Sequence, residues 1–552
     1  MSGSADTREG VIGTVAGPGD GPNEFVFVTP DNQTVKTGEF IVYSVSIDGH
    51  ERNVFARVTN REQARGLPET FMADPGVGPE TVAATLGVPI DDIDLYRLTA
   101  TVIGFYDTDM TTFSNPRQLP EPGTPLRRAP AEQLETVLPN LDASSDQVDV
   151  ASIDGLAHLG WLLNRPAESV NLRIPIEELA STHLAILAST GSGKSYAASV
   201  LIEEMMQPDS RAALLIFDPH GEYDTLAEMQ GEEQFRGEDG YEPEVDYFDP
   251  DRLRVRISEL ELGDVMAVLD DLSNRMQERL AGGWRAMQRQ ESRTWSVDDL
   301  VAQMYNIYGQ DDASVGALEW RLRRSIQRND LFQPDANVPL EDLVAPGRCT
   351  VLQMDTLNRR NQQMIATVLL RRLYRARLED ERGRDSAVDF PLFALFEEGH
   401  RFAPAGSGVA PSLGIIRTIT SEGRKFGFGI GIISQRPSKI DQDTLSQCGT
   451  LISLQIQNPT DQEAIKKSVE AAGEDVLREL PGLTPGQAVV SGDSMNTPVL
   501  IRVRERHTPH GAESLTATED WCEAYGARQR KPDSSEHADF GGGESTGVQD
   551  LD

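Results

Sequence analysis

Hydrophobic and polar positions alternate over the N-terminal part of the chain in short β-type runs separated by Gly, Pro and Asp. This pattern is typical of a small antiparallel barrel, with one short inserted helix expected at residues 79–86. The strand-like runs are residues 24–28, 38–46, 53–58 and 96–105. We therefore predict an N-terminal β-barrel over residues 1–130 and a Pro-, Ala- and Asp-rich linker over residues 131–154. Because no catalytic constellation occurs in the barrel, docking or oligomerisation is its simpler interpretation.

Beyond residue 155 the pattern changes to continuous apolar runs, which predict buried strands of a parallel sheet. These runs are residues 183–188, 212–217, 349–354, 391–396, 427–434, 450–455, 487–491 and 498–503. Helices are expected between them at residues 196–206, 364–378, 412–425 and 461–470, and in an amphipathic stretch at 265–281 and 317–328. The sequence thus predicts an α/β core over residues 155–510 with a helical insertion at about 232–343.

The strongest motif is ASTGSGKS at residues 188–195, which follows one apolar run and precedes an Ala-rich helical run. Small residues let backbone N–H groups surround an anion, the lysine reaches the β- and γ-phosphates, and the hydroxyl binds magnesium. The motif departs from G-x-x-x-x-G-K-S/T because Ala188 replaces the first glycine, which is tolerated if φ is negative. A chance Gly/Ser turn is the competing interpretation. The predicted ATP-binding residues are Ser189, Thr190, Gly191, Ser192, Gly193, Lys194, Ser195 and Tyr196.

A second motif consists of the apolar run 391–396 followed by Glu397 and Glu398, which is the Walker B pattern of a P-loop ATPase. We predict that Glu397 holds magnesium together with Ser195, and that Glu398 polarises the water that attacks the γ-phosphate. The first acid is usually Asp, so its direct contact with the metal is an open point. With Lys194 these residues predict a RecA-like P-loop ATPase core.

Three further positions have two interpretations each. Asp218 or Glu222, after another buried strand, either orders water or metal, or Asp218 simply caps the turn. Arg424 precedes the strand at 427–434 and should therefore lie away from its own phosphate loop. It is either a finger for a neighbouring subunit's ATP or an ordinary cation at a helix C-terminus. Gln435 follows the same strand and is expected near the γ-phosphate.

The charge balance is 51 basic against 88 acidic residues, and only seven of the basic residues are lysine. Acid spread along the whole chain with few lysines favours adaptation to high salt over a surface that repels acidic partners. Net charge therefore neither supports nor excludes nucleic acid, whose binding would need a local arginine cluster. The arginines at 321, 323, 324 and 328 either form such a surface or a solvated helix face.

Three widely separated cysteines offer no disulfide framework and no metal knuckle, so we expect a reducing cytoplasm. The N-terminus lacks an apolar signal core, and no apolar run approaches about eighteen residues, so no membrane span is expected. Residues 511–552 are expected to form a C-terminal extension ending in a disordered acidic tail.

Taken together, the phosphate loop, DPHGEY at 218–223, EEGHRF at 397–402, EGRKFG at 422–427 and SQRPSK at 434–439 resemble the archaeal HerA helicase family. The resemblance implies a hexameric, FtsK-like ring that pumps double-stranded DNA with ATP and Mg²⁺, and a NurA-type nuclease as partner in processing DNA ends for recombination repair. It also implies ATP-site roles for Lys194, Ser195, Glu397, Glu398, Gln435 and Arg424.

The leading hypothesis is therefore an ATP-driven DNA translocase. A conjugation- or packaging-type pump is the first alternative, and the lack of an expected membrane anchor weighs against it. A nucleotide-switched scaffold without useful turnover is the second alternative. Glu398, a carboxylate suited to polarise the attacking water, weighs against it.

Overall fold

The computed structural model describes residues 10–30, 35–47, 49–63, 95–107, 112–141, 153–269, 271–290, 294–406, 410–468 and 474–509. The chain divides into two units, Met1–Pro509 and His510–Asp552. In the second unit the described residues are 518, 521, 522 and 525. The helix expected at residues 79–86 and the predicted acidic tail lie outside the described residues.

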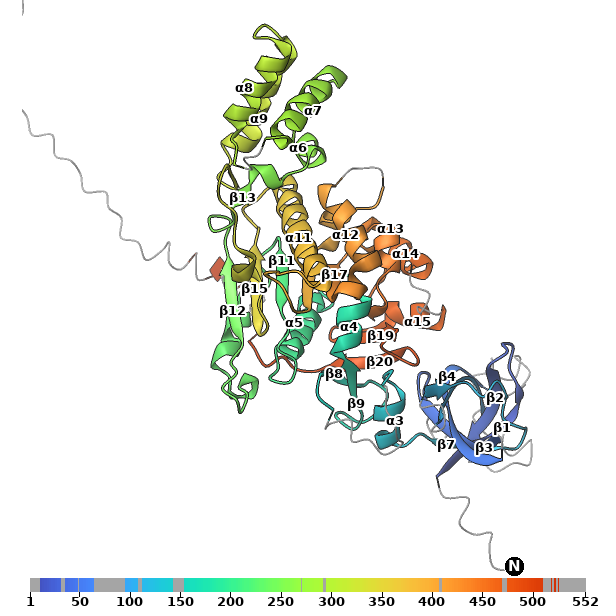
Figure 1. Cartoon of the computed structure of the whole chain (residues 1–552). Helices are drawn as coiled ribbons and strands as arrows, with labels where there is room; N and C mark the ends of the chain where they lie inside the picture. Colours follow the sequence, from blue (N-terminus) through green and yellow to red (C-terminus); the bar gives the residue numbers. More distant parts are fainter. Residues whose placement is uncertain are drawn as a thin grey trace, which may run out of the picture. The chain divides into compact units, whose positions relative to one another are not determined.

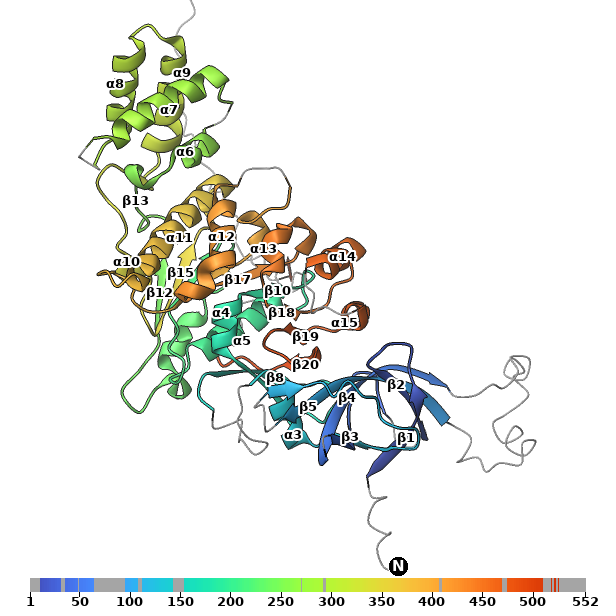
Figure 2. The same ribbon diagram turned by 45° about the vertical axis from the view of Figure 1, so that its right-hand side comes forward.

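Among the described residues, six N-terminal strands close into a barrel in the order β2-β1-β7-β3-β4-β5, because β5 pairs back to β2 (Figures 1 and 2). The short strand β6 adds to β5 outside this ring. Side chains that alternate inward, including Phe25, Phe27 and Leu98, are fully buried and form the barrel core. The predicted barrel is confirmed. Its strands are β1 (Val11–Pro18), β2 (Glu24–Pro30), β3 (Phe40–Ile47), β4 (His50–Gln63), β5 (Leu95–Asp107), β6 (Thr112–Ser114) and β7 (Pro125–Arg128).

In the described part of the chain, the core is an 11-stranded mixed sheet with the order β12-β15-β11-β16-β17-β10-β18-β19-β20-β8-β9. The strands from β12 to β18 are parallel, and the remaining four are antiparallel. Its strands are β8 (Leu156–Leu162), β9 (Asn171–Pro175), β10 (Leu184–Leu187), β11 (Leu214–Asp218), β12 (Glu244–Phe248), β15 (Arg348–Gln353), β16 (Leu392–Phe396), β17 (Phe428–Ser434), β18 (Thr450–Ser453), β19 (Gln487–Gly492) and β20 (Val499–Val503).

The central strands are apolar throughout because both faces of the sheet are covered. In β10, Ala185 and Leu187 join the hydrophobic cluster on one face, whereas Leu184 and Ile186 join the cluster on the other. Helix α5 (Lys194–Met205) packs in the second cluster, and α11 (Arg359–Glu381) and α12 (Pro411–Glu422) pack in the first. The strand that carries the phosphate loop is thus held rigidly from both sides.

Glycines in β17 have a packing role. A Cβ atom added at Gly429 would lie 2.4 Å from the Ala180 carbonyl oxygen and from the Phe393 ring, and one at Gly431 would lie 2.5 Å from Leu395. Small residues here let β17 sit between β16 and β10. The Walker B strand β16 and the phosphate-loop strand β10 therefore have one strand between them.

The helical part of the insertion contains α6 (Leu262–Val268), α7 (Asn274–Gln288), α8 (Val297–Tyr308) and α9 (Ala313–Leu322). The helix expected at residues 265–281 is interrupted, because Asp271 has a positive φ of 49° and Ser273 caps the start of α7. The helix expected at 317–328 begins at residue 313, where Asp312 caps it, and ends in a π turn, Arg323–Gln327.

The predicted domain limits stay predictions, but two segments contain elements that the sequence did not indicate. The segment expected as a linker contains α3 (Ala131–Val137), and the expected insertion contains the sheet strand β12. The other described elements are α4 (Ile176–Thr182), the pair β13 (Val255–Arg256) and β14 (Phe332–Gln333), α10 (Leu340–Leu343), α13 (Gln442–Ser446), α14 (Pro459–Ser468) and α15 (Glu474–Glu479). No helix in the ranges given above is long and apolar enough to cross a bilayer.

A buried ionic cluster ties the end of the core to α5. Glu203 and Glu204 of α5 are buried, and Arg504, just beyond β20, contacts Glu203 at 3.0 Å and Glu204 at 2.6 Å. Glu203 also accepts hydrogen bonds from the backbone N–H groups of His507 and Thr508. The helix after the phosphate loop is therefore fixed by residues about 300 positions later in the chain.

Candidate active site

The phosphate loop leaves the C-terminal end of β10 and enters α5 at Lys194. Gly191 and Gly193 have φ angles of 77° and 97°, which glycine adopts without steric cost. Ala188 is buried and is not among the described non-glycine residues with positive φ, so its replacement of the usual glycine causes no strain. The loop is anchored from two neighbouring strands, since the Ala188 N–H donates to the Ser434 carbonyl and the Ser189 N–H to the Gln455 carbonyl.

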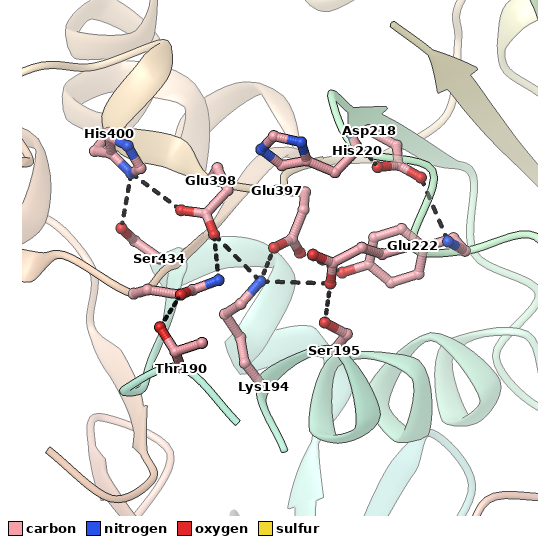
Figure 3. A network of polar contacts seen from close by, with 12 residues as sticks. Thr190, Lys194, Ser195, Asp218, His220, Glu222, Glu397, Glu398, His400 and Ser434 are labelled. Carbon is pink, nitrogen blue, oxygen red and sulfur yellow. Dashed lines mark hydrogen bonds and ion pairs between the residues drawn. The ribbon is translucent and has the colours of Figure 1, made fainter. Parts of the chain in front are cut away.

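Lys194 lies at the centre of a cluster of acids (Figure 3). Its Nζ contacts Glu397 Oε1 and lies 3.6 Å from Glu222 Oε2 and 3.7 Å from Glu398 Oε1. Lys194, Glu397 and Glu398 are each buried, with 6% or less of the residue exposed. Three carboxylates facing one ammonium group leave an excess of negative charge at the point where the phosphate loop meets the Walker B acids. The two predicted motifs therefore come together at one site.

The loop after β11 resolves the two interpretations of Asp218 and Glu222. Asp218 accepts hydrogen bonds from the backbone N–H groups of His220, Gly221 and Tyr223, so it caps the turn. Burial raises the pKa of Asp218, and these N–H groups oppose that rise. Glu222 instead accepts a hydrogen bond from the Ser195 hydroxyl. Of the two, Glu222 is the residue in contact with a predicted magnesium ligand.

Tyr223 supports the Walker B acid from the same loop. Its hydroxyl donates to Glu397 Oε2 at 2.6 Å, while Glu397 Oε1 faces Lys194. Burial raises the pKa of Tyr223 well above its ordinary value, so the phenol stays a donor. Glu397 is thus fixed through both carboxylate oxygens in the orientation seen in Figure 3.

Gln435 connects the phosphate loop to the second acid. Its Oε1 accepts from the Thr190 hydroxyl at 2.5 Å, and its Nε2 donates to Glu398 Oε1 at 2.7 Å. Because Gln435 follows β17, the strand between β10 and β16, its side chain spans the two motifs. The expected position of Gln435 beside the phosphate site agrees with these contacts.

Glu398 has an unusual backbone and a paired side chain. Its φ and ψ of 50° and 51° are left-handed, a conformation that costs on the order of 1–3 kcal/mol for residues other than glycine. His400 Nδ1 lies 3.1 Å from Glu398 Oε2 and 3.3 Å from the Ser434 hydroxyl. Burial opposes ionisation of Glu398, but the His400 hydrogen bond and the Lys194 charge outweigh it and lower the Glu398 pKa. The carboxylate is therefore kept ionised, as a group that polarises water must be.

The structure places Arg424 apart from this cluster. It lies in the turn before β17, whereas Gln435 lies after that strand, so the two residues are at opposite ends of β17. There its charge acts on buried His183, whose pKa falls to about 4 mainly through burial.

Tyr196, predicted to bind the cofactor, accepts a hydrogen bond through its hydroxyl from the backbone N–H of Arg506 at 2.8 Å.

The donor set fits a magnesium–ATP complex. The glycine-rich loop and the start of α5 supply N–H groups for phosphates, Lys194 supplies a cation, and Ser195 and Glu397 supply hard oxygen ligands. Among the described residues no group of three or more His, Cys, Asp or Glu is arranged to hold a metal. Magnesium sites of this kind are completed by substrate phosphates and water. The fold and this site define a P-loop nucleoside triphosphatase with an additional strand between the two Walker strands.

Comparison with known proteins narrows this class. The family model for the central domain of helicase HerA matches residues 157–373. A probable helicase of Methanocaldococcus jannaschii is 29% identical over 450 residues, covering 77% of this chain and 79% of the relative. The DNA double-strand break repair helicase HerA of Pyrococcus furiosus is 27% identical over 401 residues, covering 63% of this chain and 69% of the relative. The chain is thus similar to HerA helicases over most of its length.

Among solved structures, VirB4 of Thermoanaerobacter pseudethanolicus is 14% identical, with a TM-score of 0.47 and coverage of 63% of this chain and 97% of that chain. The conjugative coupling protein TrwB is 12% identical, with a TM-score of 0.43, covering 61% of this chain and 89% of that chain.

Sequence reasoning did not single out Tyr223, His400 or Ser434, although each contacts a site carboxylate or its partner. All three stand within the motifs at 218–223, 397–402 and 434–439. Their position directly after buried strands at one sheet edge was the available signal. It does not reveal which of the residues in each turn points inward.

Proposed function

We propose that this protein is an ATP-dependent DNA translocase or helicase that acts on double-stranded DNA. The observation that carries the proposal is the meeting of Lys194, Glu397 and Glu398 at one buried point, in a chain whose residues 157–373 match the central domain of helicase HerA. Four of the relatives are DNA double-strand break repair helicases by name. We also propose a role in processing DNA ends with a NurA-type nuclease; the names of these relatives support the part in double-strand break repair.

The chemistry assigned to each residue follows from its contacts. Ser195 and Glu397 would hold magnesium, which when bound neutralises phosphate charge. Lys194 lies close to three carboxylates, those of Glu222, Glu397 and Glu398. When ATP binds, it would exchange part of these contacts for contacts with the β- and γ-phosphates. Glu398, ionised and held by His400 and Gln435, is suited to polarise the attacking water. Gln435 touches both Thr190 and Glu398, so it is placed to respond to the γ-phosphate.

Arg424 is proposed to act on a neighbouring protomer's ATP in a homo-hexamer. Its place at the end of β17 away from its own phosphate loop supports this role over one in its own site. An arginine supplied in this way is worth about 10³–10⁵ in rate where it operates. The ordinary alternative, a cation at the end of α12, predicts that Arg424→Ala changes stability but not hydrolysis.

The test compares the wild-type protein with Lys194→Ala. We expect the variant to assemble like the wild type, as measured by mass in molar KCl, and to show no DNA-stimulated hydrolysis of ATP. Arg424→Ala should also lose hydrolysis but regain part of it when mixed with Lys194→Ala, because a Lys194→Ala protomer would supply Arg424 to the ATP site of an adjacent Arg424→Ala protomer, which keeps Lys194. The proposed translocase would be refuted if the wild-type protein bound ATP but hydrolysed none of it in the presence of DNA at any KCl concentration of a series. That result would favour a nucleotide-switched scaffold.

A further inference from the structure

A hollow of about 700 Å³ lies where the end of α6, the end of α9 with its π turn, and the start of α11 meet. Its described lining contains four arginines and three asparagines against a single acid, Asp271. The four arginines are Arg321, Arg324, Arg359 and Arg360. The whole chain has a net charge of −37, whereas the lining of this hollow carries an excess of positive charge.

The arginines of the π turn differ in what they face. Arg323 points to acids, with ion pairs to Asp298 at 2.9 Å and Glu319 at 3.0 Å. Arg324 lines the hollow, and its guanidinium lies 5.2 Å from the centre of the Trp320 ring. Guanidinium groups and asparagine amides that line one space are suited to phosphate oxygens, which accept several hydrogen bonds at once.

Trp320 adds a second kind of contact at the same place. It lines the hollow and is 58% exposed, an unusual exposure for the largest apolar side chain. An exposed aromatic ring beside a cationic groove is the combination that binds single strands, because a base stacks on the ring while the backbone follows the cations. A free inorganic anion would use the arginines but not the indole.

Arg359 connects this hollow to the active site. Besides lining the hollow, it donates a hydrogen bond to the His400 carbonyl oxygen at 3.1 Å. The His400 ring in turn holds Glu398. A ligand that recruits Arg359 therefore acts on the turn that carries the water-polarising carboxylate.

We propose that the hollow binds a nucleic-acid strand through its phosphodiester groups, with a base against Trp320, and that Arg359 transmits occupancy to Glu398. Binding of the strand at the hollow stands by itself, whereas transmission through Arg359 to Glu398 rests on the proposed function. Binding at the hollow is measurable without hydrolysis.

The test measures binding of a fluorescein-labelled oligothymidine to the full chain by anisotropy over a KCl series. The double variant Arg321→Ala/Arg324→Ala should bind at least roughly tenfold more weakly, because two charge-assisted contacts are lost. The slope of log affinity against log salt should flatten by about 1.4, that is, about 0.7 for each phosphate contact on a single strand. Trp320→Ala should lose about tenfold with little change in slope. Arg328→Ala, which removes one positive charge next to the π turn outside the hollow, is the control.

Transmission is tested by hydrolysis at saturating oligothymidine. The Arg321→Ala/Arg324→Ala protein should recover the full stimulation at high ligand, whereas Arg359→Ala should keep a reduced maximum. Equal affinity and slope for the control and the double variant would overturn the binding site, as would binding of polyglutamate but not oligothymidine to the wild type. A wild type whose hydrolysis no nucleic acid stimulates would refute the proposed function instead, while the binding result would still decide on the hollow.

Discussion

Replacing His400 by alanine gives the sharpest test of how Glu398 is kept ionised. The imidazole nitrogen lies 3.1 Å from Glu398 Oε2, and Glu398 is only 5% exposed. Burial alone raises a carboxyl pKa, and the His400 hydrogen bond and then the Lys194 charge bring the pKa of Glu398 below its ordinary value. Without His400, the pKa of Glu398 should therefore rise.

The size of the rise follows from the strength of the contact. A hydrogen bond to a charged group contributes about 1.5–3 kcal/mol, and one pKa unit corresponds to about 1.4 kcal/mol, so we expect a rise of about one to two units. Because the ionised form is the active one, the rate lost by the variant is greatest at low pH. At neutral pH, above both pKa values, the loss from this cause disappears.

The assay is the pH profile of kcat for ATP hydrolysis at saturating ATP and Mg²⁺, from about pH 4 to 8, where carboxylates complete their titration. The acid limb should move to higher pH in His400→Ala and move less in His400→Asn, which keeps a donor. His50→Ala, an exposed histidine of the barrel, should leave the limb in place. An acid limb that stays fixed, or moves to lower pH, in His400→Ala would contradict the assignment of His400 as the group that lowers the Glu398 pKa.

Three further predictions concern the fold around the site. Arg504→Ala should destabilise the protein by about 3–5 kcal/mol in chemical denaturation, because it leaves Glu203 and Glu204 buried without their partner; a loss below about 1 kcal/mol would show that the pair is solvated. Gly429→Ala should cost about 1–3 kcal/mol, since its Cβ would collide with a backbone oxygen, whereas Gly414→Ala, exposed and with nothing within 4 Å in α12, should stabilise by about 0.5–1 kcal/mol. Ala188→Gly should leave the Kd for ATP within about threefold and lower Tm slightly, because Ala188 needs no left-handed backbone; tighter binding on restoring the glycine would refute this.

The central parallel strands were predictable because they are buried on both faces and are therefore apolar without interruption. The expected run 391–396 contains all of β16, and the run 212–217 overlaps all but the last residue of β11. The antiparallel strands β8 and β9 were missed, because only alternate residues are buried along most of their length. The edge strand β12 was missed since it carries Glu244 and Asp246 within an acidic stretch, and an edge strand needs only one partner, β15. In β12, therefore, neither an alternating pattern nor an uninterrupted apolar run marks the strand in the sequence.

The candidate site was predictable to the level of its two motifs, because chemistry fixes the residue types of a phosphate loop and of an acid pair. The choice between Asp218 and Glu222 was not predictable, since either carboxylate can cap a turn and the difference lies in which one the backbone N–H groups surround. The same holds for Tyr223, whose hydroxyl reaches Glu397 only after β11 and β16 have paired.

The ionic cluster of Glu203, Glu204 and Arg504 also sets an order of assembly. During synthesis the phosphate-loop helix leaves the ribosome long before Arg504, so its two carboxylates have no counter-charge and resist burial until β20 has been made. A nascent chain ending before residue 504 should consequently hold that helix loosely and bind nucleotide poorly. The ATP site would mature late, as one of the last parts of the core to become competent.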